Sequence, residues 1–464
     1  MRKSFGILAV LAAAACSTTS NPPPLPQPDT GTDVPDNGPG PMDVFDAGDT
    51  PVTPDVPVTP DVPPPDLAPV DVPPGTPFCN MPTTAETEVR GAVVPTGFCV
   101  RKFTPLTTPT RRGVQHPRVI AFAPNGDLFV ASPLSTGPGG TGPGFGEIVV
   151  LPDDNHDGFA DQTLTYLNRA RLSELDTVHG LLFHGGYLYF TTFHGVWRVP
   201  YRNGDRVAPA GMPEQVANLS ESERWTHTLA VRPDGRMYVS MGIYGSSQCP
   251  YPARYKGAIL EIGPNHSMVG GRVTMGDVVA WGFRNPMYIR CQPWGSCYAA
   301  ELTDDGWSLP GQEKLVIFDN NQDYGYPCCY DRGLVSPAGR SAGMTDTSCG
   351  SITASSTGWV VGYTPFGHDF APSRWPAPHG NGLFVGMHGR VGSWEFTGIN
   401  WAPADATTHQ FMRETQVFLG GWGMGTMNPG RVADLAFAPD GRMFFTDDQQ
   451  GYVYWVAPTN LQRP

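Results

Sequence analysis

One pattern of alternating apolar and aromatic residues occurs six times along the chain, each time directly after a turn that contains glycine. Each copy follows a short apolar run such as VIAF, LLF or TLAV, and several precede a further run such as GEIVVL or GYVYWV. Alternation with a period of two predicts a β-strand, and glycine accepts the positive φ that closes a hairpin turn. The six copies are APNGDLFVAS, FHGGYLYFTT, RPDGRMYVSM, QPWGSCYAAE, HGNGLFVGMH and APDGRMFFTD.

The spacing of these copies predicts a repeat architecture. The turn glycines lie 60, 49, 60, 87 and 59 residues apart, at Gly126, Gly186, Gly235, Gly295, Gly382 and Gly441. A four-stranded unit repeated about every sixty residues is typical of a propeller blade, so we expect an all-β fold, a six-bladed β-propeller over residues 78–464. A β-sandwich with similar turns is the alternative. The long fifth interval contains three cysteines, and we expect a disulfide-tied loop there on one face of the disc.

The first sixteen residues, MRKSFGILAVLAAAAC, combine a basic start with an apolar run that is too short to span a bilayer. This combination is typical of a secretory signal peptide. Because residues 1–16 end at Cys16, they resemble a bacterial lipoprotein signal, and we expect Cys16 to be lipidated. The chain would then be an outer-membrane lipoprotein that faces the periplasm or the exterior. No other apolar run approaches eighteen residues, so we expect membrane contact through the lipid anchor only.

Residues 17–77 differ in composition from the rest of the chain, with the echo TPDVPVTPDVPPPD, ten Asp and no Lys or Arg. Proline-rich sequence without apolar periodicity does not pack a core, so we expect a disordered Pro/Asp-rich tether. The whole chain has a formal net charge of −13, but without this segment and the two basic residues of the signal it has 33 acidic and 28 basic side chains. Such a balance gives no reason to expect nucleic-acid binding.

Eight cysteines remain after Cys16, which in an exported chain favours up to four disulfides. Proximity in the sequence suggests Cys79–Cys99 and Cys291–Cys297. No Cys-x-x-Cys spacing occurs, which makes a zinc site improbable. Cys328 and Cys329 are adjacent, and neighbouring Cα atoms lie about 3.8 Å apart, below the usual disulfide range, so we expect each to have a separate partner.

Several segments together resemble the sorbosone and soluble glucose dehydrogenase family. They span roughly residues 94–457 and include VPTGFCVRKF, HPRVIAFAPNGDLFVAS, VHGLLFHGGYLYF and GRVADLAFAPDGRMFFTDD. WGFRNP followed by a YGYP turn is the most specific part, whereas Pro-Asp-Gly phrases are common to propellers. The resemblance implies a six-bladed propeller that oxidises a sugar with pyrroloquinoline quinone and calcium.

The resemblance also assigns roles to individual positions. Arg284 and Asn285, in WGFRNP, would contact the quinone, and a planar guanidinium suits quinone or carboxylate oxygens. The alternative for Arg284 is to tie neighbouring blades through backbone carbonyls. Arg390 would face the cofactor carboxylates, and Gln248 matches a cofactor-site Gln. The position of an Asp five residues before that Gln holds Ile243 here.

The calcium and the catalytic base are the points where this chain departs from the family. The calcium-binding carbonyls fall on Thr303 and Asp304, where the family has Gly-Pro; a solvated acidic loop is the alternative. The base position, nine residues before Pro233, holds Arg224 rather than His, and an Arg cannot accept a proton at neutral pH. His227 stands three residues later and is our candidate base, with an ordinary strand histidine as the alternative. His179 and His116 are weaker candidates for the same channel.

A second calcium candidate is the segment DDNHDGFAD, residues 153–161. It alternates oxygen-bearing side chains and includes Gly158 for a sharp turn, in the manner of calcium loops. Leu164 occupies the twelfth position, where an EF-hand needs Glu, so a complete EF-hand is excluded. A polar loop held by Asx turns is the alternative. The candidate ligands are Asp153, Asn155, Asp157 and Asp161.

These observations favour an exported dehydrogenase that transfers hydride from an aldose or sorbosone-like sugar to pyrroloquinoline quinone with Ca²⁺. The alternative is a non-catalytic propeller lipoprotein that binds a glycan or a protein at the channel mouth, and both Arg224 and Ile243 favour it. A calcium-dependent hydrolase of the lactonase kind is a third possibility. It needs a cluster of carboxylates around its metal, and the sequence places only Glu301 and Asp304 close together.

Overall fold

The computed structural model describes residues 75–80, 88–89, 91–104, 114, 116–133, 146–175, 177–219, 223–246, 248–253, 255–262, 273–390, 396–421 and 430–463. The chain separates into two compact units, Met1–Pro65 and Asp66–Pro464, and all described residues belong to the second. The predicted signal, Cys16 and nearly all of the predicted tether lie outside the described residues, so these domain boundaries remain predictions. Within the described ranges, no helix is both long enough and apolar enough to cross a bilayer.

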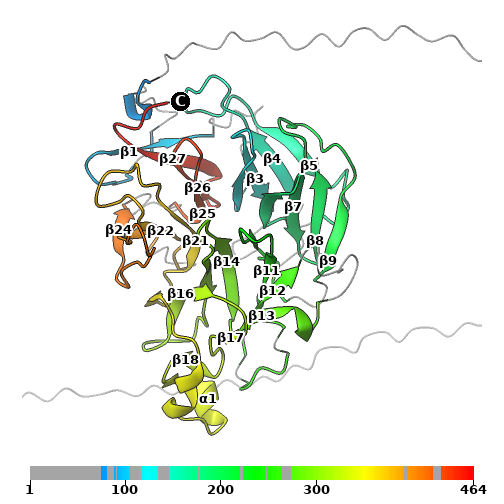
Figure 1. The fold of residues 1–464 in the computed structure, drawn as a ribbon, viewed down its shortest axis with the longest axis vertical. Helices are drawn as coiled ribbons and strands as arrows, with labels where there is room; N and C mark the ends of the chain where they lie inside the picture. The colour runs from blue at the N-terminus through cyan, green and yellow to red at the C-terminus, as the bar shows by residue number, and fades with distance from the viewer. Residues whose placement is uncertain are drawn as a thin grey trace, which may run out of the picture. The chain divides into compact units, whose positions relative to one another are not determined.

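Six antiparallel sheets follow one another around a ring, which confirms the predicted six-bladed β-propeller (Figure 1). The first blade contains β2 (Ile120–Phe122), β3 (Leu128–Ser132), β4 (Glu147–Leu151) and β5 (Leu164–Asn168). The second contains β6 (Leu181–His184), β7 (Tyr187–Thr192), β8 (Gly195–Pro200) and β9 (Glu214–Asn218). The third contains β10 (Leu229–Val231), β11 (Met237–Met241), β12 (Ala258–Ile262) and β13 (Val278–Trp281), with β17 (Gln322–Asp323) added in parallel at its edge.

The other three blades follow the same order from the inside outwards. The fourth contains β14 (Asn285–Cys291), β15 (Cys297–Leu302), β16 (Gln312–Phe318) and β20 (Thr357–Val360). The fifth contains β21 (Pro365–Phe370), β22 (Leu383–Met387), β23 (Gly398–Ala402) and β24 (Gln416–Leu419). The sixth contains β25 (Val432–Phe437), β26 (Met443–Asp447), β27 (Tyr452–Pro458) and β1 (Phe98–Lys102).

The sixth blade takes its outer strand from the other end of the domain. Strand β1 pairs antiparallel with β27, in a register that runs from Phe98 opposite Pro458 to Lys102 opposite Tyr454. This pairing could not be predicted from the sequence, because the two strands stand at opposite ends of the domain and no local pattern links them. The pairing closes the ring with backbone hydrogen bonds.

The turns follow the prediction in five blades and depart from it in one. Gly126, for example, has a φ of 95° in the hairpin turn of the first blade, as the motif predicts. Gly382 does not have a positive φ; the left-handed residue in that turn is its neighbour Asn381, at 61°. Gly382 is required for a different reason, because a Cβ there would overlap the indole nitrogen of Trp401.

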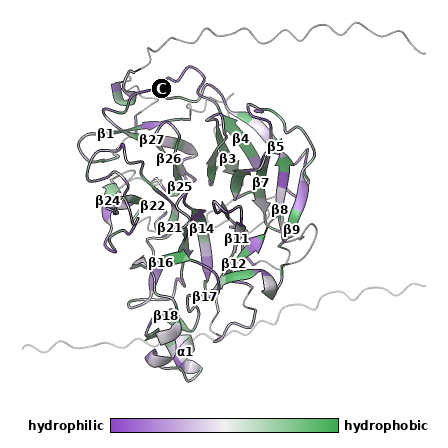
Figure 2. Ribbon diagram, viewed as in Figure 1, coloured by the Kyte–Doolittle hydropathy of each residue, from purple (hydrophilic) through white to green (hydrophobic). Residues whose placement is uncertain are grey.

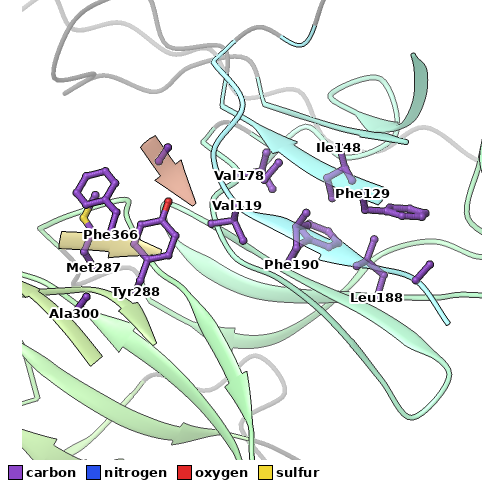
Figure 3. Packing of buried hydrophobic residues seen from close by; sticks show 14 of the residues in the cluster. Val119, Phe129, Ile148, Val178, Leu188, Phe190, Met287, Tyr288, Ala300 and Phe366 are labelled. Carbon is purple, nitrogen blue, oxygen red and sulfur yellow. The ribbon is translucent and has the colours of Figure 1, made fainter. Parts of the chain in front are cut away.

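Apolar strands pack face to face between blades and form the core. Strands β3 and β4 are predominantly hydrophobic (Figure 2) and almost entirely buried. Met287, Tyr288 and Phe366 lie together on inner strands (Figure 3), and the Tyr288 and Phe366 ring centroids are 5.3 Å apart. The ring of His179 approaches Tyr288 at 5.3 Å, so aromatic rings fill the middle of the central channel.

All predicted cysteine pairings are confirmed. Cys79 bonds Cys99, and Cys291 bonds Cys297. Cys328 and Cys329 have separate partners, as expected, in Cys249 and Cys349. The last two bonds tie down a small lobe between β17 and β20 (Figure 1), which consists of β18 (Cys329–Asp331), β19 (Leu334–Val335), α1 (Pro337–Ser341) and the 3₁₀-helix η3 (Asp346–Ser351).

The chain enters the described domain at the turn end of the sixth blade. The 3₁₀-helix η1 (Phe78–Asn80) donates from Phe78 N to the Leu461 carbonyl, and the guanidinium of Arg442 lies 4.3 Å from the Phe78 ring. Arg442 directly follows the hairpin turn that ends the inner strand β25. Another 3₁₀-helix, η2 (Met275–Asp277), precedes β13.

The close approach of the chain at Gly257 allows the packing between Gly257 and Phe283 to be tested by substitution. Gly257 has a φ of 64°, and a Cβ at this position would overlap the carbonyl oxygen of Phe283. Gly186 has a φ of 80° with open space around it, so alanine there carries only the cost of the backbone conformation, about 1–2 kcal/mol. We expect Gly257→Ala to lower the free energy of unfolding in denaturant titrations by at least about 1 kcal/mol more than Gly186→Ala. Equal losses would contradict this account.

Candidate functional site

A cavity of about 430 Å³ lies at one end of the central channel, where inner strands begin. Five of the six blades supply its wall. The lining residues are Arg118, Arg224, Trp225, Thr226, Arg284, Asn285, Met287, Leu302, Asp305, Val361, Gly362, Thr364, Phe366, His388, Arg390 and Arg431. The later residues of the same inner strands line a second cavity of about 340 Å³, beyond the aromatic rings that fill the middle of the channel.

The charge of the first cavity is strongly positive. Its lining includes five guanidinium groups, and two carboxylates stand against them: Asp305 in the wall and Asp448, which forms an ion pair of 2.9 Å with Arg118. The net charge of this set is +3. Such a field favours an anionic ligand.

Arg284 and Asn285 both line the cavity, and their contact with a quinone stays a prediction. Arg284 is 6% exposed and donates to the carbonyls of Tyr244 (3.1 Å) and Thr303 (2.7 Å) and to the carboxylate of Asp305 (3.0 Å). It therefore also ties loops of the third and fourth blades, which was the alternative interpretation. The Asn285 amide oxygen accepts a hydrogen bond from Thr226 at 3.3 Å.

The predicted calcium ligands at Thr303 and Asp304 are already hydrogen-bonded within the protein. The Thr303 carbonyl accepts from Arg284, and the Asp304 carbonyl accepts from Trp307 N at 2.9 Å. The Asp304 carboxylate accepts from the Tyr326 hydroxyl at 3.1 Å and from Gly306 N at 3.0 Å. Among the described residues, no three His, Cys, Asp or Glu side chains gather in an arrangement that holds a metal. Calcium at these carbonyls remains a prediction.

The loop at residues 153–161 has its oxygens engaged in the same way. Asp153 forms an ion pair of 3.3 Å with Arg442, and burial raises its pKa to about 6. Asn155 and Asp157 accept backbone N–H groups two residues further on, which is the Asx-turn arrangement. Asp161 accepts from Asp154 N at 2.7 Å. The side chains thus stabilise the loop itself, and a structural calcium here also remains a prediction.

Arg390 and Gln248 differ in their positions. Arg390 lines the cavity, is exposed and donates to the Val361 carbonyl at 3.1 Å. Gln248 is exposed in the loop beside Cys249, where its backbone N–H bonds Ser246, and it is not one of the residues that line this cavity.

The candidate base His227 does not line the cavity either. Its side chain is fully buried, and Nδ1 donates to the Ser240 carbonyl at 2.8 Å. Arg224 lines the cavity, with its guanidinium 4.3 Å from the Tyr244 ring and donating to the Ile243 carbonyl at 3.2 Å. Burial, and then the charge of Arg284, lowers the pKa of Arg224. The assignment of His227 as base therefore gains no support from its position and stays a prediction.

A buried network that the sequence analysis missed forms the floor of the cavity. The imidazole of His388 accepts from Arg431 at Nδ1 (2.5 Å) and donates from Nε2 to Asp448 (3.0 Å), which also pairs with Arg118. Burial lowers the pKa of His388 to about 3, so this imidazole is neutral. Although burial alone would raise it, Arg118 and then His388 hold the pKa of Asp448 well below its usual range.

A signal for part of this network was present in the sequence. Arg118, Arg284 and Arg431 each stand one or two residues before an inner strand, in HPRVIAF, WGFRNP and GRVADLAF. Only the second was assigned a role. The repeated placement of an Arg at the start of an inner strand identifies all three as candidates for the channel mouth.

Comparison of this chain with known proteins finds matches in structure. No family model and no curated protein sequence matches it. A Trichoderma reesei carbohydrate-active enzyme of family AA12 is similar in structure, with 19% identity, a TM-score of 0.60, and 81% of this chain and 100% of that chain covered. The PQQ domain of the pyranose dehydrogenase of Coprinopsis cinerea gives 15% identity, a TM-score of 0.61 and coverages of 81% and 98%.

A third similar structure is the PQQ-bound aldose sugar dehydrogenase of Streptomyces coelicolor, with 16% identity, a TM-score of 0.52, and 79% of this chain and 100% of that chain covered. At such identities the likeness establishes the fold. It agrees with the six-bladed propeller that the resemblance implied.

Glu313, on β16 behind the cavity wall, is expected to make the stability of the protein depend on pH. It accepts the backbone N–H of Thr364, which lines the cavity, and burial raises its pKa to about 8. The pKa of Glu in an unfolded chain is about 4.3. Between this pKa and the folded pKa of about 8, the unfolded chain has lost a proton that the folded protein keeps. This carboxyl therefore lowers stability as pH rises, by up to about 1.4 kcal/mol per pH unit.

We expect the free energy of unfolding of Glu313→Gln to fall less steeply than that of the wild type between about pH 5 and pH 8. Denaturant titrations at several pH values measure this slope. Glu414→Gln, at an exposed position, is the matched control and should follow the wild type. Parallel curves for Glu313→Gln and the wild type would show that the carboxyl is ionised in the folded protein.

Proposed function

We propose that the cavity binds pyrroloquinoline quinone and that the protein is an exported sugar dehydrogenase, which transfers hydride from an aldose to this quinone. The observation that carries the proposal is the set of five guanidinium groups against two carboxylates. The net charge of +3 matches a planar tricarboxylate, which is what pyrroloquinoline quinone is. The fold shared with PQQ-containing sugar dehydrogenase structures supports the same cofactor.

The residues present fit this cofactor in shape as well as charge. The guanidinium of Arg118 lies 5.2 Å from the Trp225 ring and 5.7 Å from the Phe366 ring, and its Nε and Nη1 are buried without a partner in the described protein. Two N–H groups beside aromatic walls suit a carboxylate on a flat ring system. Arg284 and Arg390 supply positive charge from the opposite side. When bound, the quinone supplies the two-electron acceptor, and the arginines keep it oriented.

The proton of the sugar hydroxyl needs an acceptor, and the cavity offers few. Both ring nitrogens of His388 are engaged, and the guanidinium groups cannot accept a proton. Asp305 is the carboxylate in the lining, with its side chain 81% exposed and an ion pair of 3.0 Å to Arg284. We propose Asp305 as a second candidate acceptor, in addition to His227, since a carboxylate is able to accept the proton through water.

The position of His227 also favours a second candidate function, a propeller that binds a glycan or a partner protein without catalysis. At the position where the resembling enzymes have their base, the cavity presents Arg224, and His227 is buried behind the wall. Such a binder would keep the cationic mouth and lack turnover. In either case export and anchoring through Cys16 remain proposals that rest on the sequence.

Quinone binding tests the proposal directly. We expect the purified protein to bind pyrroloquinoline quinone saturably at micromolar concentration, followed by absorbance, and Arg390→Ala to weaken binding at least about tenfold, because a hydrogen bond to a charged group contributes about 1.5–3 kcal/mol. Arg374→Ala removes an exposed Arg that donates to the Pro439 carbonyl away from the cavity, and it should bind as the wild type does.

Turnover separates the two candidate functions. Aldose-dependent reduction of a dye by the quinone-loaded protein, with and without added Ca²⁺, would support the dehydrogenase. Quinone binding without such reduction would favour the non-catalytic binder. Absence of quinone binding in a folded sample would overturn the cofactor assignment itself.

A further inference from the structure

Two exposed aromatic side chains on different blades lie next to the wall of the cationic cavity: one contacts a residue that lines it, and the other contacts the residue between two lining positions. Tyr244, in the loop after β11, is 48% exposed, and Phe396, before β23, is 40% exposed. Each is fixed by contacts with a residue at or beside the cavity wall. We propose that these rings stack on sugar rings outside the cavity, so that the protein binds a saccharide of two or more units rather than a single sugar. This inference rests on the proposed function.

Phe396 is held in a conformation that a bulky residue rarely adopts. Its φ is 67°, and its ring stacks on Tyr363 with centroids 4.2 Å apart and planes 11° from parallel. Tyr363 lies between Gly362 and Thr364, which both line the cavity. A left-handed conformation at a non-glycine residue costs of order 1–3 kcal/mol, and such residues cluster at functional sites. One face of the Phe396 ring is covered by Tyr363, which orients the ring beside the mouth.

Tyr244 is fixed on the other side by the arginines of the wall. Its carbonyl accepts hydrogen bonds from Arg284 at 3.1 Å and from Arg224 at 3.3 Å, and the guanidinium of Arg224 covers one ring face at 4.3 Å. The backbone on either side of this residue is therefore anchored although its ring is half exposed. A rigid, half-exposed ring gives contact area at low cost in side-chain entropy.

The exposed aromatic faces of Tyr244 and Phe396 favour a saccharide as the ligand. The C–H face of a pyranose is apolar, and it packs on an aromatic face while its hydroxyls stay in water or reach polar groups. In this proposal the reacting end lies beside Thr226, Asn285 and Asp305, and the next sugar units stack on the two outer rings. A ligand with a single ring would occupy the cavity without contact to both aromatic residues.

Calorimetric titration of matched saccharide pairs tests the inference. The probes are glucose with maltotriose and cellotriose, xylose with xylotriose, mannose with mannotriose, and galacturonic acid with trigalacturonic acid, added to the full-length protein with and without pyrroloquinoline quinone. We expect at least one trisaccharide to bind about tenfold or more tightly than its monosaccharide. The double variant Tyr244→Ala and Phe396→Ala should lose this gain and keep the monosaccharide affinity.

Two controls separate stacking from folding. His409→Ala removes the partner of another stacked pair, His409 on Trp294 with centroids 3.7 Å apart, at the turn end of the fourth blade, and should leave the gain unchanged. Phe396→Tyr keeps the ring and should retain the gain. No gain for any pair, or a gain that survives the double variant, overturns the inference. If the gain appears but quinone does not bind in the same samples, the dehydrogenase proposal fails and the saccharide site stands.

Discussion

The pairing of β1 with β27 is the interaction on which the rest of the structure depends. A propeller is a ring of sheets, and without β1 the sixth blade would lack its outer strand and leave the edge of β27 unpaired. Five registered residue pairs join the two ends of the domain. The buried cavity floor lies across this closure, because Arg118 precedes the first blade while Asp448 and Arg431 belong to the sixth. The floor is therefore complete only when the first and sixth blades are packed next to each other.

The arginines of the cavity supply positive charge and also hold together the loops that form its wall. Burial of a guanidinium is unfavourable unless its donors are satisfied, and Arg284 meets this requirement through carbonyls of neighbouring loops. The same bonds fix the loops that form the wall. The loop after β11 is held further by the Cys249–Cys328 disulfide and by a hydrogen bond of 2.9 Å from Ser246 N to the Tyr326 hydroxyl. Positive charge at this mouth is thus built into the junction of two blades.

The sequence was sufficient for the blades and for local cysteine pairs, because both depend on short-range patterns. A hairpin turn needs its glycine within a few residues, so Gly126 and its counterparts reveal the repeat. It was not sufficient where partners lie far apart. Arg118 and Asp448 are separated by more than three hundred residues, and nothing near either one indicates the other. His227 shows a further limit, since one step along a strand decides whether a side chain faces the channel or the interior of its blade.

The entry segment and the cationic mouth lie at opposite ends of the sixth blade. The segment that begins at residue 75 joins beside Leu461 and Arg442, at the end of the sixth blade where β25 finishes, whereas the cationic mouth lies where β25 starts. The described entry segment, residues 75–80, therefore lies at the opposite end of the sixth blade from Arg431. Residues 75–80 therefore take no part in lining the cavity, and the longer saccharide proposed above would extend from the mouth without contacting them.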